Sequence, residues 1–267
     1  MKQLKLPTLF YGALLFLSAF TSTLVASNKV VQYSSYVGLI QKLFDGFVPM
    51  SEVLENGDHG IGTTHALDGE AIIMDGFSYR VTFDGDVEKI SDDETTPYIT
   101  IADTSATKPL KLQLSAGTCV AELTETVKEV SEGKFQANYP YAVRIEGVFK
   151  KVKARSIPKL EKPYIELSEV AANQSVFEFE DEEFTIIGFW NPKYADAFNP
   201  PEWHIHGLNK DLTGGGHILD FETGKGVIVK LWKKTGFDIH LPDTEAFAEA
   251  NFDQDFGAAV QQINRDK

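Results

Sequence analysis

The sequence predicts an α+β or mixed α/β protein in which β-sheet dominates. Apolar residues recur at helical spacing near the start of the chain, between residues 36 and 47. Short apolar runs separated by Asp-Gly turns then begin near residue 61, and two long extended segments follow at 141–157 and 175–190. The halves of the chain are not separated by a repeat or a low-complexity linker, so sheet and helix are expected to share one body.

Three segments are predicted to be helical. Residues 36–47 place their apolar side chains on one face of a helix. Ser51 is the candidate N-cap of a short helix that ends at Gly57. Thr118 is the candidate N-cap of an amphipathic helix that ends before Gly133. In the second and third helices a hydroxyl is expected to accept a hydrogen bond from the first turn, and a glycine is expected to end the last turn.

The strands are predicted from alternation and from turn residues. Asp75-Gly76 and Asp84-Gly85 each separate two apolar runs, which is typical of a β-meander. The two extended segments continue the sheet. Residues 226–242 are predicted to add one more strand, and the acidic tail after them is predicted to be helical.

Composition limits the kind of partner. The chain has 267 residues, 43% of them hydrophobic, which is enough to bury a substantial core. Its net charge of −14 disfavours binding to nucleic acid, because neutralising phosphates requires clustered Lys and Arg. We therefore expect a small-molecule partner. The single cysteine, Cys119, cannot form an intrachain disulfide, so the core alone must hold the fold together.

Residues 1–27 have the features of a secretory signal peptide. Two lysines precede an uncharged apolar run over residues 6–20, and small residues follow it. The run is shorter than the roughly 20 residues of a membrane span, although an uncleaved anchor is the alternative. We expect a mature chain of residues 28–267, exported to the periplasm or the medium, with no membrane association after cleavage.

Three of the six histidines lie close together in the sequence. His204 and His206 are two residues apart, so on a β-strand they project from the same face. A turn-rich loop over residues 209–216 ends in three glycines, and the chain is expected to reverse there into a second strand that begins at His217. Three neutral imidazoles with an open fourth position are a recurring catalytic zinc arrangement.

The donor set leaves some alternatives open. Imidazole ligands suit Zn²⁺ best, but Mn²⁺, Fe²⁺, Co²⁺ and Ni²⁺ also accept them. A cupin barrel is the rival reading of the His-x-His pair. That family usually has a glutamate four or five residues after the pair, and residues 207–211 contain none.

Several stretches resemble the alpha-acetolactate decarboxylase family, in order and over nearly all of the mature chain. They are GIGTTHALDGEAI (60–72), YAVRIEGVFKKVKARSIPKLEKPY (141–164), GFWNP (188–192), WHIHGLNKDLTGGGHILDF (203–221) and DIHLP (238–242). The resemblance implies two closely packed parts built on mixed β-sheets with flanking helices, divided near residues 135–160. It implies decarboxylation of 2-acetolactate to acetoin and CO₂, and it leaves open a homodimer.

The resemblance also implies site residues. Glu70 would be a metal-side carboxylate or an acid, Thr63 would line the pocket and Arg155 would orient the substrate; Arg144 is the alternative arginine. Where the family's tail usually has a glutamate that reaches the metal, this chain has Asn264. The proton donor is therefore open.

Other polar residues near these motifs are candidates either for the site or for a purely structural role. Asp266, Glu202 and a metal-bound water are the candidate substitutes for the missing glutamate, but Glu202 is expected to be a surface carboxylate. His59 and His65 are expected to be loop histidines with satisfied hydrogen bonds, and His240 is expected to be structural.

The residue types fit the chemistry of a β-keto acid. The electrons left by departing CO₂ flow onto the substrate's own ketone oxygen, so no organic cofactor is needed. Zinc held by His204, His206 and His217 can chelate the hydroxyl and ketone oxygens and stabilise the enediolate that develops. The alternatives are an exported metalloenzyme of altered activity, such as a zinc hydrolase, and a non-catalytic metal-binding relative.

Overall fold

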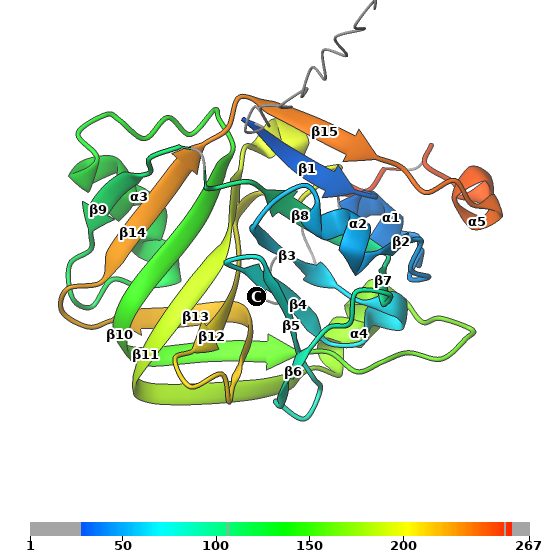
Figure 1. The fold of residues 1–267 in the computed structure, drawn as a ribbon, viewed down its shortest axis with the longest axis horizontal. Helices are drawn as coiled ribbons and strands as arrows, with labels where there is room; N and C mark the ends of the chain where they lie inside the picture. The colour runs from blue at the N-terminus through cyan, green and yellow to red at the C-terminus, as the bar shows by residue number, and fades with distance from the viewer. Residues whose placement is uncertain (1–27, 106, 254, 258–267) are drawn as a thin grey trace, which may run out of the picture.

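The computed structural model describes residues 28–105, 107–253 and 255–257, and they form two main β-sheets that lie side by side (Figure 1). The seven-stranded sheet has the order β15-β1-β8-β3-β4-β5-β6. Its strands are, in that order, β15 (Gly236–His240), β1 (Lys29–Tyr33), β8 (Tyr98–Ala102), β3 (His59–Thr63), β4 (Glu70–Met74), β5 (Phe77–Val81) and β6 (Val87–Lys89). All neighbours are antiparallel except β1 and β15, which are parallel.

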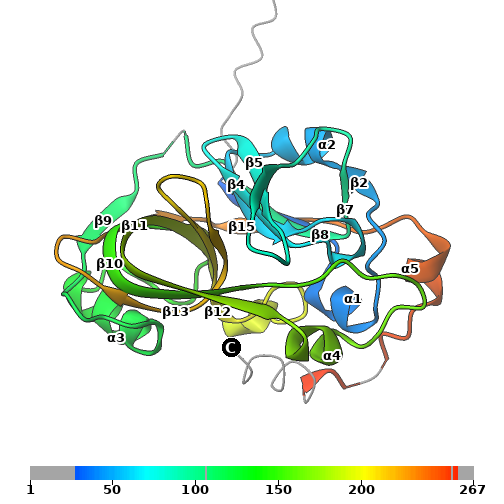
Figure 2. The ribbon, with the colours of Figure 1, turned by 90° about the horizontal axis from the view of Figure 1, so that it is seen from below.

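The six-stranded sheet has the order β11-β12-β13-β10-β14-β9. Its strands are β11 (Ser175–Asn191), β12 (Glu202–Asn209), β13 (Gly215–Thr223), β10 (Tyr141–Ser156), β14 (Ile228–Lys233) and β9 (Leu110–Gln113). Strand β10 also pairs with β11 along nearly its whole length, so β10, β11, β12 and β13 close into a ring, as Figure 2 shows. An apolar core that includes Phe149, Phe184 and Phe221 belongs to this sheet.

Short helices flank both sheets. They are α1 (Tyr36–Ile40), α2 (Met50–Leu54), α3 (Val120–Val130), α4 (Leu167–Ala172) and α5 (Glu245–Glu249), with 3₁₀ turns at η1 (His65–Leu67) and η2 (Lys193–Ala195). A small pair of strands, β2 (Val48–Pro49) and β7 (Thr95–Thr96), completes the fold. Within the described ranges, no helix has the length and apolar character needed to cross a membrane. The predicted class, mixed sheets with flanking helices, is confirmed.

The two sheets pack against each other through a shared apolar layer. Ile61 and Ile72 from the seven-stranded sheet meet Ile187, Phe189 and Trp232 from the six-stranded sheet, and all five are buried. Glu70 lies two residues before Ile72 on the same strand, so its side chain points toward this layer as well. A polar group is thereby placed between the sheets, where it is shielded from water.

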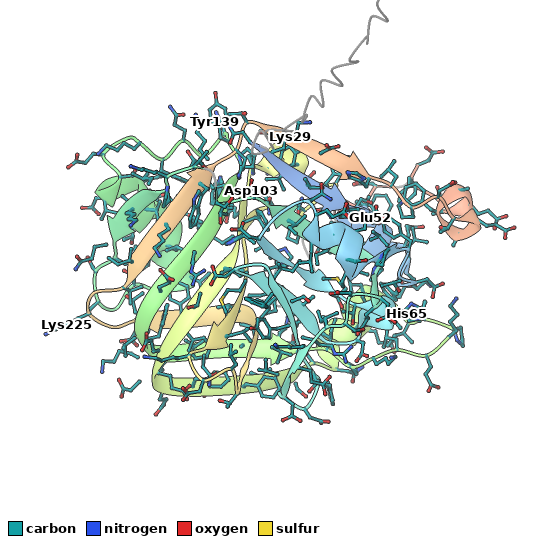
Figure 3. The ribbon with its side chains drawn as sticks, viewed as in Figure 1. Lys29, Glu52, His65, Asp103, Tyr139 and Lys225 are labelled. Carbon is teal, nitrogen blue, oxygen red and sulfur yellow. The ribbon has the colours of Figure 1, made fainter. Side chains whose placement is uncertain are left out.

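The chain passes from one sheet to the other between β8 and β9. Asp103, labelled in Figure 3, follows the last residue of β8, and Lys225, at the left edge of the same view, marks the turn that leads into β14. The chain then returns to the seven-stranded sheet with β15. A division into subdomains near residues 135–160 stays a prediction, since the change of sheet itself comes earlier in the chain.

The helix boundaries differ from those predicted at residues 36–47 and at Ser51. Helix α1 ends at Ile40 because Lys42 adopts a left-handed φ of 61°, so the apolar residues after it lie in a loop, where Phe44 is buried and Leu43 and Phe47 are partly exposed. Helix α2 begins at Met50, and Ser51 lies inside it rather than capping it. The amides of Met50 and Ser51 donate to the carbonyls of Glu94 and Asp92, so no side-chain cap is needed.

The third helix is also capped differently from the prediction. Its N-cap is Cys119, one residue after Thr118. The Asp220 carboxylate, from strand β13, accepts a hydrogen bond from the amide of Val120 at 3.1 Å, while the Thr118 hydroxyl donates to the carbonyl of Ser115. The cap therefore comes from a residue 100 positions away in the sequence.

The strands follow the predictions more closely. The turn at Asp75-Gly76 joins β4 to β5, with both residues at positive φ, and the turn at Asp84-Gly85 joins β5 to β6. Residues 226–242 form two strands in different sheets rather than one. The strand after the glycine loop begins at Gly215, two residues before His217. In the tail the structure has helix α5, and residues 258–267 lie outside the described part of the chain.

Candidate metal centre and active-site pocket

The three histidines predicted as ligands come together on two neighbouring strands. His206 on β12 lies directly opposite His217 on β13, and His204 lies two residues away on the same face of β12. All three are buried, with exposed fractions of 7% or less. One nitrogen from each ring can be chosen so that the three atoms lie within 4.8 Å of one another. The hairpin therefore builds the predicted cluster.

The spacing of these nitrogens fits a single metal ion. His217 Nδ1 and His206 Nε2 are 3.2 Å apart. Two nitrogens bound to one tetrahedral zinc at about 2.0–2.1 Å each are separated by about 3.3 Å. The other nitrogen of His206, Nδ1, lies 3.1 Å from the carbonyl oxygen of Ala71. With its proton on Nδ1, His206 donates to that carbonyl, and Nε2 is then the nitrogen whose lone pair can bind a metal.

Glycine is required beside His217 because two strands approach closely there. Gly216 has a φ of +130°, and a Cβ atom on it would lie 2.2 Å from the carbonyl oxygen of Arg155. Arg155 is the partner of His217 in the β10–β13 register. The glycine thus lets β13 lie against β10 so that His217 and Arg155 are neighbours.

Glu70 brings a carboxylate to the histidine cluster. Its Oε2 lies 3.6 Å from His206 Nε2, and its Oε1 lies 4.0 Å from Arg155 Nη1. The residue is only 4% exposed, and Oε1 has no hydrogen-bond partner among the described residues. Burial raises the pKa of the Glu70 carboxyl to about 7, and the positive charge of Arg155 limits that rise.

Thr63 supports the carboxylate from the neighbouring strand. It is the register partner of Glu70 in the β3–β4 pair and is buried. Its hydroxyl donates to the carbonyl of Gly69 at 2.8 Å, which fixes the residue just before Glu70. The hydroxyl proton of Thr63 is used in this hydrogen bond, so toward the pocket its oxygen can act only as an acceptor.

A single pocket contains the predicted groups from both sheets. Its polar side is formed by the three histidines with Thr63, Glu70 and Arg155, and its apolar side by Leu39, Leu67, Ile157, Leu167, Val170, Ala171 and Pro200. Helices α1 and α4 supply part of the apolar wall. The arrangement suits a small ligand that has oxygen atoms at one end and methyl groups at the other.

The pocket also contains two tyrosines that the sequence analysis did not identify. Tyr36 is the first residue of α1, and Tyr98 is the first residue of β8. Each is the first residue of an apolar element, so the sequence pattern predicts a core residue at both positions. Only the packing of α1 over the sheet brings them into the pocket.

Arg144 and Glu202 lie outside the pocket. Arg144 forms ion pairs with Asp75 at 2.7 Å and with Glu146 at 2.6 Å, so Arg155 is the arginine at the site. Glu202 begins strand β12 with its side chain exposed, as expected of a surface carboxylate. Asn264 and Asp266 lie outside the described residues.

The remaining histidines have structural surroundings. His59 is the first residue of strand β3 rather than the predicted loop residue; it is buried, and its Nε2 lies 3.0 Å from the carbonyl of Gly188. His65 is exposed at the edge of the molecule, as labelled in Figure 3, and its Nδ1 accepts a hydrogen bond from the amide of Gly46. The ring of His240 stacks on that of Tyr33 at 4.7 Å between centroids.

Known proteins are similar to this chain in both sequence and fold. The model of the alpha-acetolactate decarboxylase family matches residues 30–254. The chain is 35% identical to the alpha-acetolactate decarboxylase of Methanosarcina mazei over 240 residues, covering 90% of this chain and 81% of that protein. It is 34% identical to the enzyme of the same name from Bacillus licheniformis over 235 residues, covering 88% and 90%.

A solved structure agrees with these matches. The crystal structure of acetolactate decarboxylase from Bacillus subtilis subspecies spizizenii superposes with a TM-score of 0.81 at 31% identity, covering 88% of this chain and 99% of that one. The sequence match and the fold match thus indicate the same family, and the matched residues include the histidine cluster and the described residues of its pocket. The chain belongs to the alpha-acetolactate decarboxylase family, a family of carbon–carbon lyases.

Proposed function

We propose that this protein decarboxylates 2-acetolactate to acetoin and CO₂, with zinc held by His204, His206 and His217. The observation that carries the proposal is the buried histidine cluster, which faces Glu70 and Arg155 in one pocket. Membership of the family supports the substrate and the reaction. The three-imidazole donor set supports zinc.

The chain supplies ligands that bring no charge of their own. Three neutral histidines leave the full positive charge of a divalent ion available to the substrate. A bound zinc ion supplies Lewis acidity toward the oxygen on which negative charge develops as CO₂ leaves. His206 is held in the right tautomer by the carbonyl of Ala71, so this ligand is oriented before any ion arrives.

Arg155 is positioned to bind the carboxylate of the substrate. Its guanidinium lines the pocket on strand β10, beside His217 and 4.0 Å from Glu70. A planar guanidinium can hold a carboxylate with two parallel hydrogen bonds and so fix its orientation relative to the ketone. Because the molecule carries a net charge of −14, a cation inside the pocket is also needed to attract an anionic substrate.

Glu70 is positioned to hold the hydroxyl of the substrate. Its Oε1 is buried and has no hydrogen-bond partner in the described part of the chain, although it lines the pocket. A substrate hydroxyl that donates to this oxygen would satisfy it. Thr63, through its hydrogen bond to the carbonyl of Gly69, keeps the carboxylate in place.

The apolar wall complements the methyl groups of the substrate. Leu39, Leu67 and Ile157 lie in the wall, with α4 contributing Val170. Such a wall excludes water from the reacting carbon, and this strengthens every electrostatic interaction inside the pocket. It also favours the departure of CO₂, because the carboxylate passes its negative charge to the ketone oxygen and an apolar surrounding solvates the starting carboxylate poorly.

One purification tests the proposed function. Protein that starts at Asn28 is analysed for metal, given racemic acetolactate, and followed for acetoin with and without a chelator. We expect about one zinc per chain and acetoin formation that the chelator abolishes. Zinc without acetoin would contradict the decarboxylase, and hydrolysis of an ester or amide panel would then indicate the altered activity. Light scattering on the same sample tests for a homodimer.

We also propose that the protein is exported. The support is the signal-like sequence of residues 1–27, together with the position of β1, which begins at Lys29. Cleavage after Ser27 would therefore remove none of the described strands. Cell fractionation followed by N-terminal sequencing of the mature protein tests this, and an intact N-terminus in the cytoplasmic fraction would contradict it.

A further inference from the structure

The side chain of Tyr36 is buried in the wall of the pocket, and its hydroxyl is left without a partner. The residue is 4% exposed and lines the same pocket as the histidine cluster and Arg155. Its hydroxyl oxygen is buried and forms no hydrogen bond with any residue in the described ranges. A buried hydroxyl without a partner destabilises the folded protein, so its presence calls for a reason.

The backbone around Tyr36 is fixed by several hydrogen bonds. Ser35 caps helix α1 by accepting from the amide of Gly38 at 3.1 Å. The amide of Tyr36 donates to the carbonyl of Phe198, and the next amide donates to the carbonyl of Ala197, both at 3.1 Å. The first turn of α1 is thus tied to the segment just before β12. These hydrogen bonds fix the backbone from which the Tyr36 side chain projects into the pocket wall.

The other tyrosine of the pocket shows a contrast. The Tyr98 hydroxyl donates to the side-chain oxygen of Asn199 at 3.1 Å, and so its hydrogen bonding is satisfied within the protein. Tyr36 and Tyr98 pack in the same apolar cluster, yet only Tyr36 lacks such a partner among the described residues. We therefore expect the hydrogen-bond partner of the Tyr36 hydroxyl to be an atom of the bound ligand.

The surroundings of Tyr36 indicate which part of the ligand that is. The positive charge of Arg155 acts on the Tyr36 hydroxyl, although burial is the stronger influence and raises its pKa well above the ordinary value. The hydroxyl therefore keeps its proton and remains a donor. The Tyr36 hydroxyl and the Arg155 guanidinium are both hydrogen-bond donors in one pocket. Together they suit an anionic acceptor, such as a carboxylate, that can bind to both.

We propose that the Tyr36 hydroxyl donates a hydrogen bond to the carboxylate of the substrate, beside Arg155, and so acts as a positioning residue that selects for a carboxylate-bearing ligand. This inference rests on the proposed function, because the carboxylate is that of 2-acetolactate. Arg155 on β10 supplies the charge, and Tyr36 on α1 supplies a second, directional donor in the same pocket. Two donors that converge on one carboxylate hold its plane more firmly than one.

The reaction predicts which kinetic constant this hydrogen bond affects. The carboxylate carries its charge in the bound substrate and loses it as CO₂ forms. A donor to this group therefore stabilises the ground state at least as much as the transition state. Its removal should raise KM and leave kcat nearly unchanged.

The test is Tyr36→Phe, which removes the hydroxyl alone. We expect KM for acetolactate to rise about tenfold and kcat to stay within about threefold of the wild-type value. Binding is measured separately by calorimetry with the reduced substrate, in which a hydroxyl replaces the ketone so that no reaction occurs, and with butane-2,3-diol, which lacks the carboxylate. Affinity for the reduced substrate should fall about tenfold, and affinity for the diol should not change.

A matched control is Tyr33→Phe. Tyr33 is also buried, but its hydroxyl accepts a hydrogen bond from Asn56 at 2.9 Å and lies outside this pocket. Its removal should lower the urea midpoint and leave KM unchanged. Removal of the Tyr36 hydroxyl should leave the urea midpoint unchanged or raise it, because the lost group has no partner in the unliganded protein.

The outcomes separate this inference from the function on which it rests. Wild-type protein that neither binds the reduced substrate nor converts acetolactate would overturn the proposed function and this inference with it. Wild-type protein that does both, with Tyr36→Phe indistinguishable from it, would overturn the inference alone. A fall in kcat with KM unchanged would place the hydroxyl at the ketone end and would equally overturn it.

Discussion

His206 occupies the central position among the ligands. Its Nε2 lies 3.2 Å from His217 Nδ1 and 3.6 Å from Glu70 Oε2, while its Nδ1 meets the carbonyl of Ala71. The ring thus links both strands of the hairpin to strand β4 of the other sheet. A change at one ligand is therefore expected to affect the whole centre rather than one bond.

Replacing His217 tests the centre at the scale of one side chain. In His217→Ala we expect bound zinc to fall from about one per chain to near zero, together with loss of acetoin formation, because two imidazoles hold zinc far more weakly than three. Metal analysis after dialysis measures the first effect. The control is His65→Asn, which keeps an acceptor for the Gly46 amide at an exposed site and should retain its zinc. Full zinc in His217→Ala would contradict the assignment.

His59 predicts a dependence of folding stability on pH. Burial lowers its pKa from 6.5 to about 4, although the hydrogen bond to Gly188 opposes that change. Between those values the unfolded chain binds a proton that the folded chain does not. Stability is therefore highest above pH 6.5, falls as the pH is lowered toward 4, and loses about 3 kcal/mol through this group over the window.

The variant His59→Gln isolates this contribution. Glutamine can still donate to the Gly188 carbonyl, but it does not titrate. The free energy of unfolding in urea is measured for both proteins at pH 7, 6 and 5. The advantage of wild type over the variant should shrink as the pH falls. A constant difference across the three values would show that His59 is not kept neutral by burial.

At the scale of elements, the hairpin of β12 and β13 was predictable because its signals are local. His204 and His206 share a strand face by periodicity, and the glycines after residue 213 mark the reversal. The starts of α2 and α3 were not predictable, because their partners are remote. Asp220 caps α3 from a strand 100 residues away, and the backbone of residues 92–94 receives the first amides of α2. Tyr36 was missed for the same reason, since only the docking of α1 places it in the pocket.

Gly216 tests whether the close approach of β13 and β10 builds the centre. In Gly216→Ala the new methyl group would lie 2.2 Å from the Arg155 carbonyl, so the strands must separate. We expect a loss of more than about 3 kcal/mol in unfolding free energy, together with weakened zinc binding. The control is Gly226→Ala, which also has a positive φ but meets nothing within 4 Å, and should cost about 1 kcal/mol with zinc retained. Equal effects of the two would rule out the close approach as the cause.

At the scale of the whole molecule, the pocket exists only because the two sheets meet. The hairpin histidines and Arg155 come from one sheet, Thr63 and Glu70 come from the other, and α1 and α4 complete the wall. The local motifs indicated the histidine cluster, whereas the convergence of Glu70, Thr63 and Arg155 on it was implied only by the resemblance to the family. That convergence depends on the apolar layer between the sheets, whose members are spread from Val30 to Trp232. Contacts over such separations leave no local pattern in a sequence.

Two truncations test how the seven-stranded sheet is completed. A chain that ends at Asp243 keeps β15 and loses α5, in which no residue is buried. A chain that ends at Thr235 loses β15 as well and leaves β1 at the edge of the sheet. We expect the first to unfold at nearly the wild-type urea concentration and the second to be insoluble, since an apolar edge strand promotes aggregation. A soluble and equally stable second truncation would show that β15 is dispensable.

The parallel pairing of β1 with β15 also affects when the seven-stranded sheet can fold during synthesis of the chain. The two partners are separated by about 200 residues, which a ribosome takes on the order of ten to forty seconds to add. Throughout that interval the apolar segment Val-Val-Gln-Tyr of β1 has been made but lacks the neighbour that covers its outer edge. Folding of this sheet therefore cannot finish during synthesis of its first half. We therefore expect the soluble yield to depend on which proteins bind the nascent N-terminal segment while the ribosome completes the rest.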